Sequence, residues 1–495
     1  MTTIRPAIPA ERLDIPWWSA PVLAIGGLLF LIWFLSTGVS QIIVAALLVS
    51  LGVVGVLLKP NIVIVATFIF LPLLGDVRRY ISLGAGRTTN DPLILVGPAM
   101  AAMLFARLLF ERRIRPDTPL AKLVATLMIM MTLEIFNPLQ GGITVGIAGA
   151  LYFLVPLLWF WIGRSTPTQR VTRTTIKVVI PMVAIGATAL GLFQTYVGWL
   201  SFEAQWIREQ KAMFTALLVG DNIVRPFSFF TSPAEFACYL SIGLVCCCAP
   251  LLARRFNWSS LLVLPIGYML FLASVRTAIV LSLLSVLVMW SVMGGDSKKV
   301  AIRTVVALFV ILPCLYLGLR RLSNFNSSPD RAGVLTEHTL DGLLRPGEST
   351  AESHKEEAID GVISGIKNPI GYGLGATTMA AGKFGNGKTA GFEQDVANIF
   401  SSLGVAGGVL YIVLMARVLL VVFNVWSESR SLIAVIILAI LVSQLGNWLT
   451  GSHYSTSALV WFLIGSIDRT QIPTASERYA VPRIKHSYAN LAHSS

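Results

Sequence analysis

The sequence predicts an all-α fold, a polytopic transmembrane helical bundle of about 12–14 helices with one large non-cytoplasmic loop that contains short helices. Of the 495 residues, 55% are hydrophobic and only 13% are charged, whereas about a quarter of the residues in a soluble domain are charged. The apolar residues form successive runs long enough to cross a bilayer. Because backbone amides in hydrocarbon must bond within their own segment, each run is expected to be a helix.

The order of apolar and polar segments divides the chain into five parts. These are a cytoplasmic N-terminus at 1–16, a first transmembrane part at 17–319, a large loop at 320–395, the last helices at 396–467 and a basic cytoplasmic tail at 468–495. The expected spans are 17–35, 40–58, 61–75, 92–110, 119–136, 142–163, 175–199, 233–253, 259–274, 277–293, 302–319, 396–424, 432–450 and 453–467. The third, ninth and last are short, so some of them are candidates for re-entrant or tilted segments.

The positions of Lys and Arg predict the orientation, because short loops rich in these residues stay in the cytoplasm. The loops expected there carry Lys59, Arg112, Arg113, Arg115, Arg164, Arg170, Arg173, Lys177, Arg254, Arg255, Lys298, Lys299 and Arg303. Both termini are therefore expected in the cytoplasm. The net charge of +13 has the same explanation. The basic residues separate apolar runs and do not gather on one soluble face, so no nucleic-acid partner is expected.

The five cysteines all lie in apolar segments and lack the spacing of metal ligands. They are Cys238, Cys246, Cys247, Cys248 and Cys314. Free cysteines in such segments behave as small apolar residues. We therefore expect no disulfide framework, no metal site and no cofactor.

The loop 320–395 is too long to be a simple connection, since connections above about 15 residues are usually functional or disordered. Ser349 and Glu352 form a capping-box pair that predicts a helix, which ends at Asn368–Pro369. His354 lies near the apolar face of this helix. The predicted topology places this loop, the connection 200–232 and the turn at Arg276 on the same side of the membrane.

Two arginines on that side are the main candidates for binding a ligand. Arg225 precedes an apolar helix, and Arg276 lies between two apolar runs with hardly any loop to solvate it. An arginine at a membrane boundary is costly without an anion or a route to water, and its planar fork suits phosphate oxygens. The alternative is that each side chain reaches to the interface or pairs with a structural acid. Two such residues on one face favour an anionic lipid headgroup.

Candidates for proton transfer are His354 in the loop helix and Glu393 and Asp395 just before the helix that begins near 396. The alternatives are an ordinary interfacial histidine and acidic residues that complement a helix N-terminus. The Gly371–Gly375 run lacks the preceding strand of a nucleotide loop, so we interpret it as a tight turn. The isolated polar groups within spans, Glu134, Gln194, Gln444 and Asn447, are typical either of ion sites or of helix–helix bridges.

Several short motifs occur in a characteristic order. The first is Arg225-Pro226-Phe227 continuing through Thr231-Ser232-Pro233, and the second is Ser274-Val275-Arg276 at the start of a helix. A turn follows at Asn368-Pro369-Ile370-Gly371-Tyr372-Gly373, and then a helix with Ser402-Leu403-Gly404 and further glycines. Over roughly residues 137 to 467 this combination resembles the bacterial O-antigen ligase and O-antigen or exopolysaccharide polymerase superfamily.

The resemblance favours the polymerase-like branch. Ligase-type members have a His-Asn pair before the late helix, where this chain has Glu393-Gln394-Asp395. A polymerase-like branch has a His in the loop helix and a Glu before the late helix, similar to His354 and Glu393. This implies glycosyl transfer from an undecaprenyl-pyrophosphate carrier to an acceptor sugar hydroxyl at the periplasmic face of the bacterial inner membrane. Arg225 and Arg276 would hold the pyrophosphate, and Glu393 or His354, with Asp395 in reserve, would act as the base.

The partners that the resemblance implies are a polyprenyl-pyrophosphate-linked oligosaccharide, membrane lipid, and flippase and chain-length regulator proteins. Three alternatives to a polymerase stay open: an O-antigen ligase, a transporter or flippase of a lipid-linked or anionic substrate, and a non-catalytic assembly partner. A transporter needs polar residues towards both faces of a central cavity. This chain concentrates its unusual polar groups on one side, which favours the enzyme.

Overall fold

The computed structural model describes residues 41–85, 91–166, 169–210, 218–219, 223–295, 297–323, 330–345, 351–385, 391–449 and 454–471. The chain there is almost entirely helical, and one two-residue hairpin, β1 (Leu218–Val219) with β2 (Ile223–Val224), forms its sheet. The prediction of an all-α helical bundle is confirmed for these residues. The expected first span at 17–35 and most of the basic tail lie outside them.

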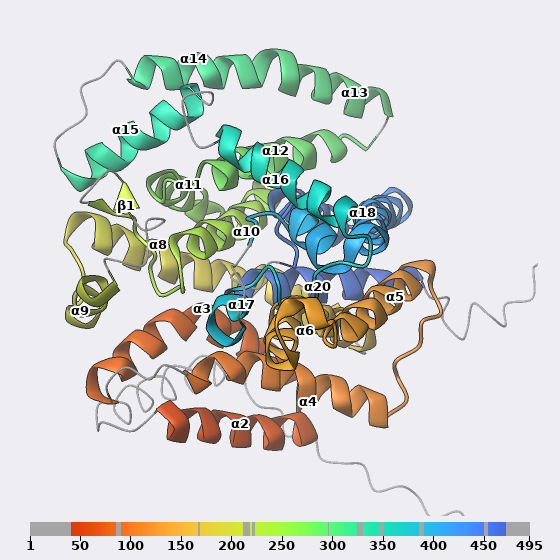
Figure 1. Cartoon of the computed structure of the whole chain (residues 1–495). Coiled ribbons are helices and arrows are strands. Elements are labelled where there is room, and N and C mark those ends of the chain that lie inside the picture. The colour runs from red at the N-terminus through yellow and green to blue at the C-terminus, as the bar shows by residue number, and fades with distance from the viewer. Residues whose placement is uncertain are drawn as a thin grey trace, which may run out of the picture.

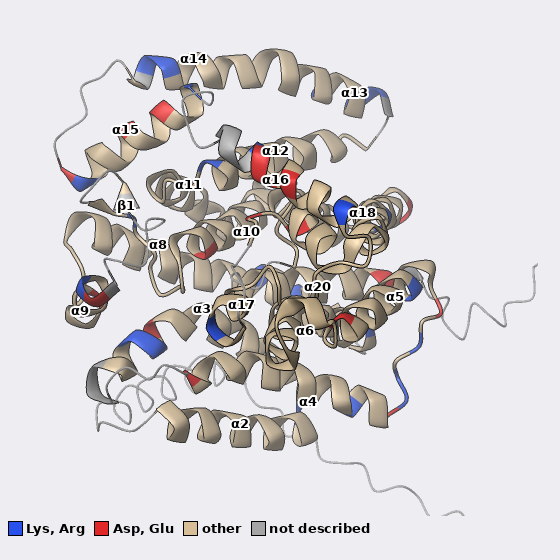
Figure 2. Ribbon diagram, viewed as in Figure 1, with Lys and Arg blue, Asp and Glu red and all other residues tan. Residues whose placement is uncertain are grey.

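Eight helical segments in this part of the chain are long and apolar enough to cross a membrane. They are Gln41–Leu58, Pro60–Ser82, Pro92–Phe110, Ile143–Ser165, Gln169–Tyr196, Pro233–Leu252, Lys298–Arg321 and Asp395–Ser429. Shorter apolar helices cover Trp258–Leu272, Arg276–Val292 and Leu432–Ser443. The expected span 432–450 is shorter than predicted, since its helix ends at Ser443 and is followed by a turn in which Gly446 has a φ of 92°. Figure 2 shows that most of the ribbon lacks charged residues.

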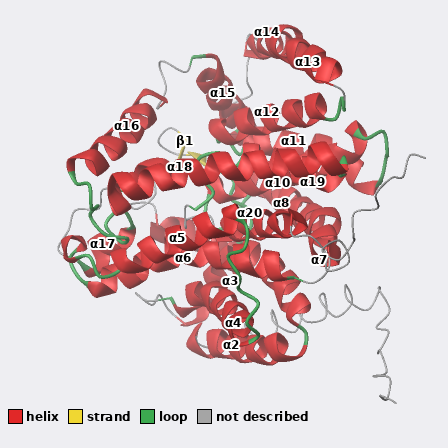
Figure 3. Ribbon diagram, turned by 90° about the vertical axis from the view of Figure 1, so that its right-hand side faces the viewer, coloured by secondary structure: helices red, strands yellow, loops and turns green. Residues whose placement is uncertain are grey.

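The helices form a layered bundle (Figure 1). One edge contains α2 (Gln41–Leu58), α3 (Pro60–Ala85) and α4 (Val96–Phe110), and the middle contains α5 (Pro119–Glu134), α6 (Ile143–Ser165) and α20 (Tyr454–Asp468). Next come α7 (Gln169–Thr174), α8 (Ile180–Tyr196), α10 (Pro233–Leu252), α11 (Val263–Leu272), α12 (Arg276–Val292), α18 (Asp395–Ser429) and α19 (Leu432–Ser443). Both views place α13 (Ser297–Val306) and α14 (Leu312–Ser323) at the opposite edge (Figures 1 and 3).

Glycines allow the closest contact in the bundle, between α6 and α20. A Cβ atom at Gly163 would lie 2.0 Å from the carbonyl oxygen of Phe462, and one at Gly465 would lie 1.9 Å from that of Phe160. Small residues let helix backbones approach in this way, and the approach increases dispersion contacts where no hydrophobic driving force between helices exists. The pair therefore anchors the centre of the fold.

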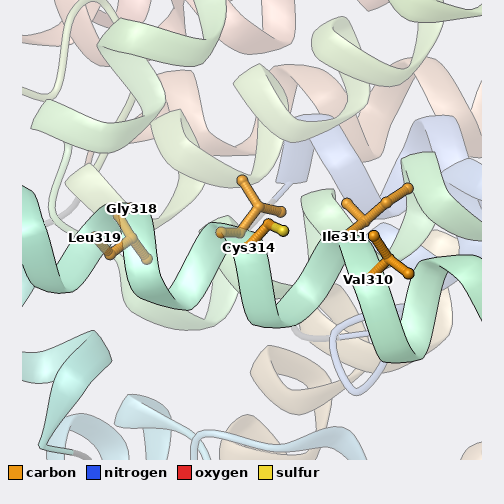
Figure 4. Close-up of a pocket in the computed structure, with 6 residues that line it drawn as sticks. Val310, Ile311, Cys314, Gly318 and Leu319 are labelled. Atoms are coloured by element: carbon orange, nitrogen blue, oxygen red, sulfur yellow. The ribbon is translucent and has the colours of Figure 1, made fainter.

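The edge helix α13–α14 differs from the rest because most of its apolar side chains are exposed. Its surface carries a shallow apolar groove of about 510 Å³ (Figure 4). The groove is lined by Val310, Ile311, Cys314, Leu315, Gly318 and Leu319. None of the candidate arginines lines it, so the groove is not the candidate site.

The loop 320–395 contains three short helices that pack on the bundle. They are α15 (Arg331–Leu344), α16 (Ala351–Lys367) and α17 (Met379–Phe384). The helix expected from the capping box and the Asn368–Pro369 stop corresponds to α16. It packs closely on α18 through Gly365, whose added Cβ would lie 2.3 Å from the carbonyl oxygen of Phe400. The described part of this loop is thus folded against the bundle and is not a simple connection.

Candidate anion site

Arg225 and Arg276, which are 51 positions apart in the sequence, meet at one imidazole. The Nη2 atom of each lies 3.2 Å from Nε2 of His338, a residue of α15. A guanidinium has only donors, so Nε2 accepts both hydrogen bonds and the proton of the neutral ring lies on Nδ1. All three side chains are partly exposed. The structure therefore brings together both predicted arginines and adds a histidine that the sequence analysis did not select.

The loop that carries Arg225 is held by a side chain of α8. Gln194 accepts hydrogen bonds from the backbone N–H groups of Phe227 and Ser228, at 3.2 and 2.8 Å, and donates to the carbonyl of Ser228 at 3.2 Å. Its amide also donates to Glu203 of α9 (Ser201–Gln210) at 2.6 Å. Ser228 has a φ of 51°, an uncommon conformation for a residue with a side chain. The hydrogen bonds of Gln194 hold this strained loop in place and therefore fix the position of Arg225.

The same loop is held from the other side by Arg79 of α3. Its guanidinium donates to the carbonyls of Ser228 and Phe230, pairs with Asp76 at 2.8 Å and lies 4.1 Å from the centroid of the Phe227 ring. The side chain is 3% exposed. Because every face of this guanidinium is occupied, Arg79 is a structural cation and is not available to a ligand.

Arg276 is placed by a tight turn and by α15. Ser274, two residues earlier, has a φ of 56°, and α12 begins at Arg276 itself. The side chain of Arg276 lies directly over Gly342, where an added Cβ would be 1.7 Å from Nε. Two loops with strained serines thus present the two arginines, a pattern that is typical of functional sites.

The site has excess positive charge and unused polar groups. Neither Arg225 nor Arg276 has an ion pair with a carboxylate among the residues that the structure describes. Nε of Arg225 and the buried hydroxyls of Ser228 and Ser274 also lack a partner. Unpaired buried donors are costly, and two adjacent cations repel each other. An anion with several oxygens beside His338 would offset the repulsion between the two cations.

The charges change the pKa values of the site. Burial lowers the pKa of His338 most, and Arg225 and Arg276 lower it further, against a smaller opposite effect of Asp341, so that it falls to about 4. Burial and the neighbouring Arg276 also lower the pKa of Arg225. His338 is therefore neutral at physiological pH and has a lone pair on Nε2.

The other candidates for proton transfer lie on different elements. Asp395 is fully buried at the start of α18, where it accepts hydrogen bonds from Tyr411 at 2.9 Å and from the N–H of Leu449 at 2.8 Å. Glu393 is exposed just before that helix. His354 belongs to α16, but its side chain lies outside the described part of the chain. Neither Glu393 nor Asp395 is among the residues that contact the two arginines.

The Gly371–Gly375 segment is a turn that docks on a break in α18. The N–H groups of Tyr372 and Gly373 donate to the carbonyls of Ser401 and Ser402, at 2.9 and 3.1 Å. Gly404 interrupts the helix with a φ of 67°, and a Cβ there would lie 1.9 Å from the carbonyl oxygen of Pro369. The glycines thus serve close backbone contact, as the sequence analysis proposed.

His338 could have been suspected from the sequence only by its position in the long loop. Nothing in its local motif marks it, and its role depends on where α15 packs. Gln194, which the sequence analysis treated as an isolated polar group, bridges α8 to the Arg225 loop. Among the described residues, no three His, Cys, Asp or Glu side chains gather as metal ligands would.

Comparison with known proteins gives no relative, since the sequence matches no protein-family model and no curated protein. The chemistry that this site supports is therefore inferred from its geometry alone.

Proposed function

We propose that the chain is a membrane glycosyltransferase that binds a lipid-linked diphosphate between Arg225 and Arg276. The observation that carries the proposal is the convergence of both guanidiniums on His338, with no acidic partner for either among the described residues. Guanidinium groups bind phosphate oxygens through paired hydrogen bonds. Because both arginines stand next to apolar helices, a diphosphate with its lipid tail in the bilayer is the anion that fits best.

The reaction proposed is transfer of an oligosaccharide from a polyprenyl-pyrophosphate carrier to a sugar hydroxyl, which lengthens a polysaccharide. The hydroxyl oxygen of the acceptor attacks the anomeric carbon, and the bond from that carbon to the phosphate oxygen breaks. The diphosphate leaves with the electron pair, and the two arginines stabilise its negative charge as it develops. This is the polymerase activity that the family resemblance implies.

His338 is the group that the geometry favours as acceptor of the proton from the sugar hydroxyl. In the structure its Nε2 lone pair accepts hydrogen bonds from both arginines. A bound diphosphate takes over those donors and neutralises the charges that lower the pKa of His338. The lone pair then becomes free and the proton affinity of His338 rises, in the direction that general base catalysis requires, while the larger effect of burial on its pKa persists.

His338 contacts both arginines, whereas Asp395 is held inside the bundle. Asp395 already accepts two hydrogen bonds inside the bundle, so its protonation would break a buried network. Glu393 and His354 remain candidates for taking the proton from the hydroxyl of the acceptor sugar. The location at the periplasmic face of the inner membrane, the cytoplasmic termini and the flippase and chain-length regulator partners belong to the same proposal.

The test uses purified protein in lipid nanodiscs with a defined polyprenyl-pyrophosphate-linked oligosaccharide. The expected product is a lipid-linked oligosaccharide of two or more repeat units. Arg225→Ala, Arg276→Ala and His338→Gln should each lower product formation by at least about 100-fold. Arg173→Ala, which changes an exposed arginine of α7, is the control and should keep full activity.

The outcomes separate the alternatives. Transfer only to a lipid A-core acceptor would indicate a ligase, and movement of the oligosaccharide across the membrane without a new glycosidic bond would indicate a flippase. Normal product lengths in both arginine variants would show that the proposed site is wrong. Full activity of His338→Gln together with inactive Glu393→Gln would move the base to Glu393.

A further inference from the structure

One face of α15 contacts the side chain of Arg276. His338 and Gly342 are four positions apart, so they lie one above the other on the same side of the helix. His338 accepts the hydrogen bond from Nη2, and Gly342 lies beneath Nε, Cζ and Cδ of the same side chain. An added Cβ at Gly342 would be only 1.7, 2.0 and 2.5 Å from these three atoms. The guanidinium therefore occupies the space that any other residue at this position would fill.

The helix α15 is held to the bundle at its N-terminal end and near its middle. At its N-terminal end, Arg331 donates to the carbonyl of Gln194 and lies 5.1 Å from the centroid of the Trp199 ring. Further along, Thr339 donates to the carbonyl of Phe271 at 3.2 Å, and Leu335 is fully buried. Because α15 is tied to α8 and to the end of α11, it cannot easily move away to accommodate a larger residue.

We propose that Gly342 is a positioning residue that sets where the guanidinium of Arg276 meets the diphosphate, an inference that rests on the proposed function of the site. It acts only by having no side chain. A methyl group there would push Arg276 off the face of α15 and break its contact with His338. The lack of a side chain at Gly342 therefore sets how the two guanidiniums lie relative to each other. Their fit to a diphosphate depends on this arrangement.

The clash would disturb the site and not the fold. The atoms that a Cβ at Gly342 would meet first belong to the far end of a flexible side chain and not to a backbone. Arg276 can therefore swing towards water at little cost to the fold. Glycine inside a helix is also less favourable than alanine. A purely structural role predicts that Gly342→Ala lowers the unfolding temperature, whereas a positioning role predicts weaker ligand binding in a protein of normal or increased stability.

The experiment measures binding of inorganic pyrophosphate to the full chain in nanodiscs by titration calorimetry, together with the thermal unfolding temperature. Gly342→Ala should weaken binding by about tenfold, the worth of one charged hydrogen bond, with an unchanged or higher unfolding temperature. The matched control is Gly267→Ala in α11, because an added Cβ there would meet nothing within 4 Å. It should bind pyrophosphate as the unmodified protein does.

A double variant shows whether Gly342 acts through Arg276. In the Arg276→Ala background, where Arg225 still supplies one cation, adding Gly342→Ala should leave the weak residual affinity unchanged. Unchanged affinity of the single Gly342→Ala variant, or a further tenfold loss in the double variant, would overturn the inference. If Arg276→Ala itself binds pyrophosphate normally, the proposed function fails. If that variant loses binding and Gly342→Ala does not, only the role of Gly342 is wrong.

Discussion

The strongest physical consequence of the site is that the pKa of His338 depends on its two arginine neighbours. Burial, Arg225 and Arg276 lower this pKa, in that order of effect, from 6.5 to about 4. Since burial is the largest of these three causes and both arginines stand at the same distance of 3.2 Å, each arginine accounts for about one pH unit or less of the change. Arg225→Ala should therefore raise the pKa of His338 by up to about one pH unit.

The measurement is an NMR pH titration of isotope-labelled histidine in the protein. The chain has five histidines, so the signal of His338 is assigned by its loss in His338→Gln. Saturating pyrophosphate should raise the same pKa in the unmodified protein, because the ligand neutralises both guanidiniums. Arg173→Ala serves as the control and should leave the signal unchanged. A pKa of His338 that stays constant in Arg225→Ala, or that falls when pyrophosphate binds, would refute the proposed coupling.

The sign of the pH dependence of stability follows from the same values. His338 binds a proton less readily in the folded chain than in the unfolded chain, where its pKa is near 6.5. Between about pH 6.5 and 4 the unfolded chain therefore takes up more protons, so stability falls as the pH falls through this range. His338→Gln should flatten this part of the curve of unfolding temperature against pH.

Three further predictions concern Glu203 and Arg79, near the Arg225 loop, and Gly404 at the break in α18. Burial, and after it nearby Asp76, raise the pKa of Glu203 to about 7 against weaker opposite effects. Its contribution to stability is therefore full below about pH 4.5 and is lost as the pH rises through about 7, and Glu203→Gln should remove this loss in thermal unfolding scans. Arg79→Ala leaves Asp76 unpaired and should destabilise the protein by about 3–5 kcal/mol. Unfolding at the normal temperature would contradict the structural role of Arg79. Gly404→Ala should lower the yield of folded protein in detergent, because the residue has a φ of 67° and no room for a Cβ; a normal yield would show that α18 can rearrange.

Some features of the site could be predicted from single residues. An arginine at the start of an apolar helix needs a counter-charge wherever the helix packs, so Arg225 and Arg276 were identifiable without a structure. The glycines of the Gly371–Gly375 turn were similarly identifiable, because residues without a side chain allow close backbone contact. Such positions can be selected from the sequence because the physical cost lies in the residue and its immediate neighbours.

Other features depend on contacts between distant segments. His338 lies in an ordinary amphipathic helix, and only the packing of α15 on α8 and α11 brings it to the arginines. The sequence analysis chose His354 because it lies near the apolar face of the predicted loop helix and because the family resemblance implies a histidine there. The capping box predicts this helix and says nothing about what the helix contacts. Asp395 has the same limit. Its sequence position suits a helix N-terminus, but its burial against Tyr411 and Leu449 is decided by the fold.

The sequence by itself determined that the chain is a helical membrane protein, because apolar run length and the cost of unpaired backbone groups in lipid act locally along the chain. It also identified Arg225 and Arg276 as candidates for an anion-binding pair. The tertiary structure alone decided that these arginines share one histidine and that Gly342 leaves room for one of them. The physical reason is that hydrogen bonds and close contacts act over a few ångströms, and only folding brings residues such as Arg225, Arg276 and His338 within that range.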